Sequence, residues 1–184
     1  MIDQTFILKI KEKDPMAFQL LYESYAPYVY AIVKNYVFDE SYRKDAMQEV
    51  FAAIFTSIKN YDAGKAEFKT WVGRVTVNQS ISFLRKTYKH KLNFNLELYS
   101  EVSETETSRF HELSREELEK LLNKMPLGYR TVFLLYVIDE YDHKEIAAML
   151  DITPETSRSQ LMRALSWIRS HIFSQDNVLR YEFR

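Results

Sequence analysis

Residues 141–172 run YDHKEIAAMLDITPETSRSQLMRALSWIRSHI, and this stretch decides the fold of the C-terminal part of the chain. It holds two runs of apolar residues at helical spacing, separated by a tight turn at 151–153. The second run starts at Pro154, a residue that favours the first position of a helix. The small side chain of Ala147 lets two helices cross closely, and the short turn fixes a steep angle between them. The stretch therefore predicts a helix-turn-helix.

The second helix of this pair has a polar face that suits DNA recognition. In a helix-turn-helix, the N-terminal part of the second helix enters the major groove. Arg158 is the best candidate for a bidentate contact to guanine, which discriminates between bases by ~1–3 kcal/mol. Arg163 is expected to bind a phosphate. A helical hairpin from an unrelated bundle is the alternative. The DNA-binding candidates on this helix are Glu155, Thr156, Arg158, Ser159, Met162 and Arg163.

The remaining segments also show helical periods. Asp14-Pro15 combines a capping residue with a proline at the first helical position, and predicts a helix that Pro27 restarts or kinks. A wide apolar stripe predicts a helix over about 42–60, and the helical period returns over 68–90 after a break at 61–67. No strand pattern persists along the chain.

These patterns predict an all-α protein with two small helical domains joined by a linker. The N-terminal domain is expected at 1–90. Residues 91–112 lack an apolar stripe, and their second half is crowded with Ser, Thr and Glu, which is typical of a linker. The helix-turn-helix domain is expected at 113–175, followed by a tail at 176–184.

Composition excludes several classes of function. The 184 residues include no cysteine, which rules out disulfides, thiol catalysis and cysteine-ligated zinc. The three glycines lie far apart, so no glycine-rich phosphate loop is formed. We expect no metal, no cofactor and no catalytic residue. With no apolar run of about 18 residues and no signal peptide, we expect a cytoplasmic protein that does not insert into a membrane.

The net charge of -1 hides an uneven distribution. Residues 68–96 hold six basic side chains and no acidic one, whereas 91–122 carry a charge of -4. Arg74, Asn78 and Arg85 share one helix face with Lys89, opposite the apolar stripe of the same helix. A basic face that also bears an amide suits contacts to phosphates and to base edges. A solvated helix surface is the alternative.

Three motifs resemble those of a known family. Residues 45–51, DAMQEVF, resemble the D-x-x-Q-E-x-F of region 2.2 in sigma factors of the sigma-70 superfamily. Residues 68–78, FKTWVGRVTVN, resemble the segment of regions 2.3 and 2.4, and EIA at 145–147 with SQLMRA at 159–164 resembles region 4. The chain resembles a two-domain sigma factor of the extracytoplasmic-function (ECF) group over about residues 5–173.

The resemblance implies a promoter-specificity subunit with core RNA polymerase and promoter DNA as partners, and with an anti-sigma factor as inhibitor. It places a minus-35 contact on the second helix of the helix-turn-helix. It also implies that the loop 61–67 captures a flipped base of the minus-10 element. Tyr61 is expected either to stack on that base or to pack within the loop. Trp71 is expected in the core, with a base contact as the alternative. The implied minus-10 contacts are Tyr61, Lys65, Lys69, Arg74, Asn78, Arg85, Lys86 and Lys89. The implied polymerase contacts are Asp45, Gln48, Glu49 and Ala52.

The chain departs from the family at the turn and at the start of the second helix. Asp151 stands where the family often has glycine, but aspartate tolerates the left-handed conformation better than most residues do. Glu155 and Ser157 replace the common small residue and valine. The promoter sequence therefore cannot be copied from relatives.

The sequence offers two alternative functions, a helix-turn-helix regulator and an all-helical enzyme. A helix-turn-helix regulator would use the N-terminal half for ligand binding or dimerisation, but it would not need the motifs at 45–51 and 68–78. An all-helical enzyme is disfavoured because the four histidines form no zinc-binding pair on one helix. The near-neutral charge predicts weak DNA binding by the chain on its own.

Overall fold

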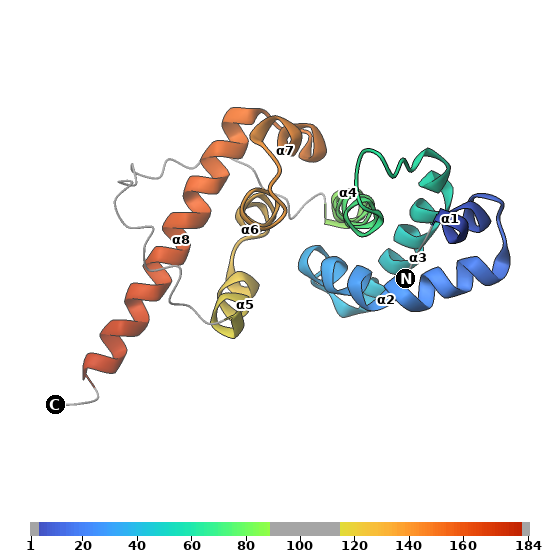
Figure 1. Cartoon of the computed structure of the whole chain (residues 1–184). Helices are drawn as coiled ribbons and strands as arrows, with labels where there is room; N and C mark the ends of the chain where they lie inside the picture. Colours follow the sequence, from blue (N-terminus) through green and yellow to red (C-terminus); the bar gives the residue numbers. More distant parts are fainter. Residues whose placement is uncertain (1–3, 89–114, 182–184) are drawn as a thin grey trace. The chain divides into compact units, whose positions relative to one another are not determined.

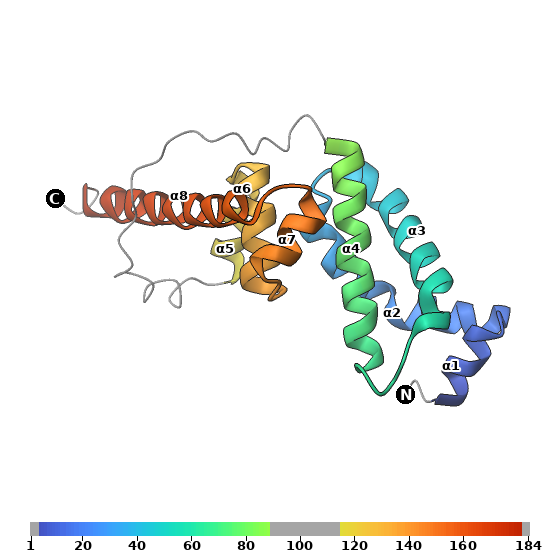
Figure 2. The same ribbon diagram turned by 90° about the horizontal axis from the view of Figure 1, so that it is seen from above.

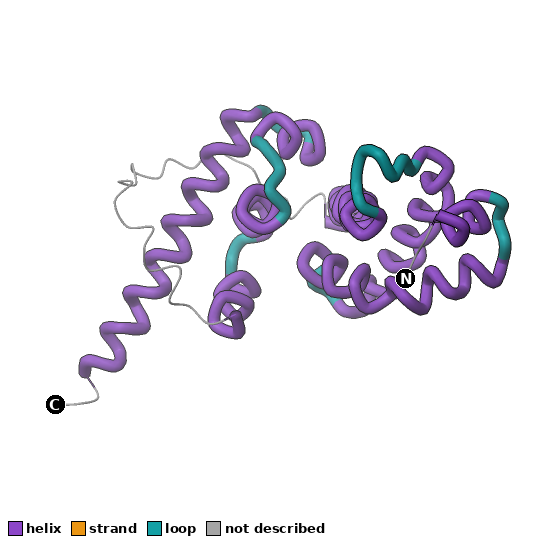
Figure 3. The backbone as a smooth tube through the Cα atoms, in the orientation of Figure 1, coloured by secondary structure: helices purple, strands orange, loops and turns teal. Residues whose placement is uncertain are grey.

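The computed structural model describes residues 4–88 and 115–181, and it divides into two compact units at 1–89 and 90–184 (Figure 1). We call these the N-terminal unit and the C-terminal unit. Every regular element in the described residues is a helix (Figure 3), which confirms the all-α class. The predicted linker, 91–112, lies outside the described residues. None of the described helices combines the length and apolar character that crossing a bilayer requires.

The N-terminal unit is built from four α-helices and one short 3-10 helix. Helices α2, α3 and α4 pack against one another, and α1 packs against α2 and η1. Figure 2 shows α4 running beside α3. The elements are α1 (Gln4–Lys11), α2 (Pro15–Tyr36), α3 (Glu40–Ser57), η1 (Ile58–Asn60) and α4 (Phe68–Tyr88).

Helix α2 begins where the sequence predicts. The carboxylate of Asp14 accepts hydrogen bonds from the backbone N–H groups of Met16, at 2.8 Å, and Ala17, at 3.2 Å. Of the two effects expected at Pro27, a restart of the helix is wrong, because the helix continues through this residue to Tyr36. Proline removes one backbone hydrogen bond, whereas burial of an apolar face supplies most of the stability of a helix in a folded protein.

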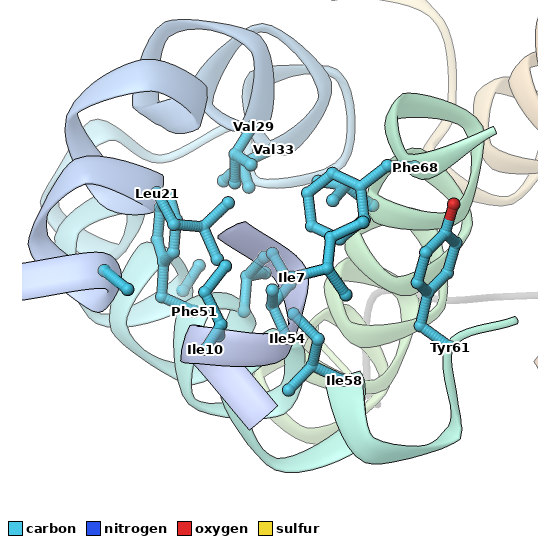
Figure 4. Packing of buried hydrophobic residues seen from close by; sticks show 14 of the residues in the cluster. Ile7, Ile10, Leu21, Val29, Val33, Phe51, Ile54, Ile58, Tyr61 and Phe68 are labelled. Carbon is cyan, nitrogen blue, oxygen red and sulfur yellow. The ribbon is translucent and has the colours of Figure 1, made fainter. Parts of the chain in front are cut away.

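The core of the N-terminal unit draws on all its helices (Figure 4). Helix α3 contributes the stripe expected from the sequence, with Val50 and Ile54 fully buried. Helix α4 buries Val77, Ile81 and Leu84, as predicted. Helix α1, which the sequence patterns did not single out, adds Ile7 and Ile10 to the same core. The cluster includes Ile7, Ile10, Leu21, Val29, Val33, Phe51, Ile54, Ile58, Tyr61 and Phe68.

The C-terminal unit contains the predicted helix-turn-helix. Helices α6 and α7 both pack against α8. The α6 segment ends in one turn of π-helix, η3. Helix α8 extends to Tyr181 and so includes residues 176–181, which were expected as a tail. No proline or glycine follows Pro154 to stop it. The elements are α5 (Arg115–Lys124), α6 (Leu127–Phe133), η3 (Leu134–Ile138), α7 (His143–Leu150) and α8 (Pro154–Tyr181).

Candidate nucleic-acid interface

The first helix of the helix-turn-helix is fixed at its start by a capping box. The carboxylate of Asp142 accepts from the backbone N–H groups of Lys144, at 2.7 Å, and Glu145, at 2.8 Å. The carboxylate of Glu145 accepts in return from the N–H of Asp142, at 2.9 Å. Backbone hydrogen bonds, chiefly the one from Glu145, hold the pKa of Asp142 below its ordinary value. An aspartate followed three positions later by a glutamate is the spacing typical of a capping box, and the structure forms both of its bonds here.

The turn between α7 and α8 depends on a left-handed residue. Asp151 has φ 58° and ψ 49°, the conformation for which the family often uses glycine. The N–H of Ile152 donates to the carbonyl of Ala147 at 3.1 Å and closes the turn. The hydroxyl oxygen of Thr153 then accepts from the N–H of Thr156, at 3.1 Å, and caps the start of α8. Aspartate therefore supports this turn without a glycine.

A side-chain contact ties α7 to the first turn of α8. Nδ1 of His143 lies 2.9 Å from the hydroxyl of Ser157, which is fully buried. The imidazole also stacks on Tyr136 of η3, with ring centroids 4.5 Å apart and an angle of 17° between the planes. Desolvation, followed by the charge of Arg158, lowers the pKa of His143. The motifs did not indicate this role, because no spacing rule pairs residues 143 and 157.

The solvent-facing side of α8 carries most of the predicted recognition residues. Glu155, Arg158 and Met162 are exposed, and Thr156 and Ser159 are half-buried. The guanidinium of Arg158 lies 3.2 Å from the carboxylate of Glu155, and both side chains are more than half exposed. The first two turns of α8 therefore offer an arginine, a carboxylate and hydroxyl groups to solvent.

Arg163 does not lie where the sequence pattern placed it. Only 7% of this residue is exposed, so its guanidinium is not presented to solvent as a phosphate contact requires. Its neighbours Gln160 and Ala164 are fully buried. The pattern failed here because helical period does not show how much of the circumference of α8 is covered by α6 and α7, which both pack against it.

Helix α4 and the loop before it present the basic side chains of the N-terminal unit. Lys65, Lys69, Arg74, Asn78 and Lys86 are exposed, and Arg85 is half-buried. The ammonium of Lys69 lies 5.2 Å from the centroid of the Tyr28 ring, which holds its stem against the unit. Lys89 lies outside the described residues.

The predicted polymerase contacts on α3 divide into two groups. Asp45, Gln48 and Ala52 are exposed, and Gln48 with Met47 lines a cavity of about 390 Å³ between α2 and α3. Glu49 is half-buried and turns toward α4. Its carboxylate accepts from Nε2 of Gln79, at 3.0 Å, and lies 3.4 Å from the ammonium of Lys86. Glu49 and Lys86 therefore contact each other in the structure, whereas the sequence assigned Glu49 to the polymerase and Lys86 to the minus-10 element.

The loop 61–67 is built around Tyr61, which packs inside the unit. The residue is 7% exposed, and its ring contacts Phe68 at a centroid distance of 5.1 Å and Trp71 at 5.4 Å. Its hydroxyl donates to the carbonyl of Ala66 at 3.1 Å. Of the two alternatives for Tyr61, the structure shows loop packing, and Trp71 lies half-buried against the core as expected. Figure 4 shows Tyr61 next to Phe68.

Within residues 4–88 and 115–181, no three histidine, aspartate or glutamate side chains converge on a position that suits a metal ion. The polar residues at the surface of α8 and α4 instead supply donors at exposed positions. Such an arrangement suits contacts to a polyanion.

Comparison with known proteins gives two matches in the sigma-70 family. The sequence profile of sigma-70 region 2 matches residues 21–90, and that of sigma-70 region 4 matches residues 115–168. Together they cover more than half of the chain. The region 2 match falls on the part that a conventional regulator would use for ligand binding or dimerisation, so that alternative is not favoured.

Curated relatives of similar length point to the same family. The chain is 25% identical over 182 residues to the ECF RNA polymerase sigma-E factor of Haemophilus influenzae, covering 92% of this chain and 95% of the relative. It is 26% identical over 151 residues to the ECF RNA polymerase sigma factor SigM of Bacillus subtilis, covering 81% and 91%. A solved structure of CnrH in complex with the cytosolic domain of CnrY aligns with a TM-score of 0.49 and 17% identity, covering 95% of this chain and 99% of that one. The chain belongs to the sigma-70 family and is an RNA polymerase sigma factor of the ECF group.

Proposed function

We propose that this sigma factor directs core RNA polymerase to promoters through separate contacts to the minus-35 and minus-10 elements. The observation that carries the minus-35 contact is the exposed guanidinium of Arg158 near the start of α8. An arginine at this position of a recognition helix reads guanine from the major groove. Glu155, Thr156, Ser159 and Met162 surround it and shape the preference for neighbouring base pairs.

The minus-10 contact belongs to α4 and the loop before it. The exposed Lys65, Lys69 and Arg74 neutralise backbone phosphates, and Asn78 offers an amide for a base edge. The exposed middle of the loop then holds an extruded base. Capture of an unpaired base offsets part of the stacking energy that is lost when the strands separate. This contact assists strand opening.

The polymerase contact uses the exposed side of α3. Asp45 and Gln48 offer a carboxylate and an amide to basic side chains of the partner, and Ala52 leaves room for close approach. The cavity beside Gln48 enlarges the surface available to that partner. An anti-sigma factor that covers these faces stays a prediction from the resemblance alone. We infer that the chain performs no covalent chemistry and works in the cytoplasm, where RNA polymerase acts.

In-vitro transcription with core polymerase on a library of randomised promoters tests this function. The wild-type chain should select two sequence elements. Arg158→Ala should flatten the preference at one position of the upstream element, by ~1–3 kcal/mol, and leave the downstream element unchanged. Arg169→Ala is the matched control, since it removes the same charge about 16 Å further along α8. Absence of a complex with core polymerase, together with no promoter-dependent transcription, would refute the proposal.

A further inference from the structure

A lysine of the N-terminal helix reaches the beginning of the loop 61–67. The ammonium of Lys11, the last residue of α1, donates to the backbone carbonyl of Tyr61 at 3.0 Å. Fifty positions separate the two residues in sequence. None of the sigma-factor motifs includes Lys11, and no spacing rule links it to the loop.

The side chain of Tyr61 holds the C-terminal end of the same loop. Its hydroxyl donates to the carbonyl of Ala66 at 3.1 Å, so this side chain spans the loop from beneath. The ring is fixed between Phe68 and Trp71, which belong to the first turn of α4. One residue therefore receives the bond from α1 through its carbonyl and holds the end of the loop through its hydroxyl.

The two residues that hold the loop, Lys11 and Tyr61, both belong to well-packed parts of the N-terminal unit. Ile7 and Ile10 bury α1 in the core that also contains Ile58 and Tyr61 (Figure 4). Ile10, directly before Lys11, has no exposed surface. The stem of Lys11 thus starts from a fixed backbone position, which favours one direction for its hydrogen bond.

The middle of the loop is exposed and internally bonded. The carboxylate of Asp62 accepts from the N–H of Gly64 at 2.9 Å, and the N–H of Lys65 donates to the carbonyl of Asp62 at 3.1 Å. Residues 62–65 are all exposed. A loop that already has one conformation loses less conformational entropy when it binds a ligand, and it distinguishes ligands more sharply.

We propose that Lys11 and Tyr61 are positioning residues for base capture at the minus-10 element. They fix the two ends of the loop so that residues 62–65 offer one geometry to an unpaired nucleobase. Tyr61 acts from below the loop and does not stack on the base. The inference rests on the proposed function of the loop, and it adds α1 to the parts of the chain that determine promoter specificity.

The test measures base preference with the full chain bound to core polymerase. The probe is a DNA duplex with a randomised single-stranded segment at the minus-10 position, and the bound molecules are sequenced. Lys11→Met removes the bond to the carbonyl, and Tyr61→Phe removes the bond to Ala66 but keeps the ring. Each should reduce the preference for the captured base about two- to tenfold, the effect expected from the loss of one hydrogen bond.

Lys9→Met is the matched control, because it removes the same charge from the same helix, and it should leave the base preference unchanged. Lys11→Arg, which keeps a donor, should restore most of the preference. Affinity for core polymerase and binding of minus-35 duplex should stay at the wild-type values, and the midpoint of thermal unfolding should fall by no more than the few degrees expected from the loss of one hydrogen bond.

The outcomes separate the inference from the proposed function. If wild-type holoenzyme selects no base in the single-stranded segment, base capture by the loop is wrong and the inference falls with it. If the wild type selects a base and both variants keep that preference, only the positioning roles are wrong. A uniform loss of minus-35 binding, polymerase binding and thermal stability would also overturn the positioning roles, since it would show that Lys11 and Tyr61 only stabilise the fold.

Discussion

At the scale of single residues, His143 connects the two helices of the helix-turn-helix. Its ring lies between Tyr136 and the first turn of α8, and Nδ1 bonds the hydroxyl of the buried Ser157. Burial disfavours the protonated form, and the nearby charge of Arg158 disfavours it further. The neutral imidazole is therefore the form that stabilises this corner of the helix-turn-helix.

The lowered pKa of His143 predicts a pH-dependent stability of the C-terminal unit. In the unfolded chain the pKa of the imidazole lies near its ordinary value of 6.5, and in the folded unit desolvation lowers it. Between these two pKa values the unfolded state binds more protons. The free energy of unfolding should therefore be highest above 6.5, fall as the pH drops below that value, and level off below the folded pKa.

Urea unfolding followed by fluorescence at pH values from about 8 to about 5 measures this dependence. The background is Trp71→Phe, so that Trp167 of α8 is the remaining tryptophan and reports on the C-terminal unit. His143→Asn keeps a polar partner for Ser157 and should remove most of the slope in that pH range. His111→Asn, at a position outside the described residues, serves as the control. Equal slopes in wild type and His143→Asn would exclude this source of the pH dependence.

Individual residues also show which parts of the candidate site can be predicted from the sequence. Arg158 was correctly placed on the exposed side of the recognition helix, because its position follows from helical period alone. Arg163 was misplaced, because its burial depends on which sides of α8 the other helices of the unit cover. The bond from Lys11 to Tyr61 was not predictable either, since it joins residues that only the tertiary fold brings together.

At the scale of elements, the helix boundaries depend on short-range chemistry that the sequence displays. Asp14 and Pro154 each marked the start of a helix correctly. Pro27 did not mark one, because the cost of a proline inside a helix is outweighed by the packing of Val29 and Val33. Local signals predict helix starts well, but long-range packing decides whether a helix stops.

The cap of α2 gives a prediction for the N-terminal unit. Asp14→Ala removes the acceptor for two backbone N–H groups and should lower the free energy of unfolding by about 0.5–2 kcal/mol. Asp14→Asn keeps an acceptor oxygen and should cost much less. The measurement is denaturant unfolding in a Trp167→Phe background, so that Trp71 reports on this unit. A loss of stability in Asp14→Asn as large as in Asp14→Ala would contradict the capping role.

At the scale of the whole molecule, the net charge of -1 sums regions of opposite sign. The exposed lysines and arginine of α4 form a basic surface, but Lys86 lies beside the carboxylate of Glu49 and Arg158 beside that of Glu155. Exposed pairs of this kind are weak and exchange readily for a phosphate. The intramolecular carboxylates therefore compete with DNA for the basic side chains when the chain is free.

This competition predicts weak and salt-sensitive DNA binding by the chain alone. Affinity for duplex DNA should fall steeply with salt, because each phosphate contact releases bound counterions. Lys69→Gln and Arg74→Gln should each reduce the slope of log affinity against log salt by about 1 and should weaken binding to all sequences alike. Lys59→Gln, which lies outside the α4 face, is the matched control. Fluorescence anisotropy with labelled duplexes measures both slopes. Tight, sequence-specific binding by the free chain would contradict the prediction, because it would show that promoter recognition does not need the polymerase.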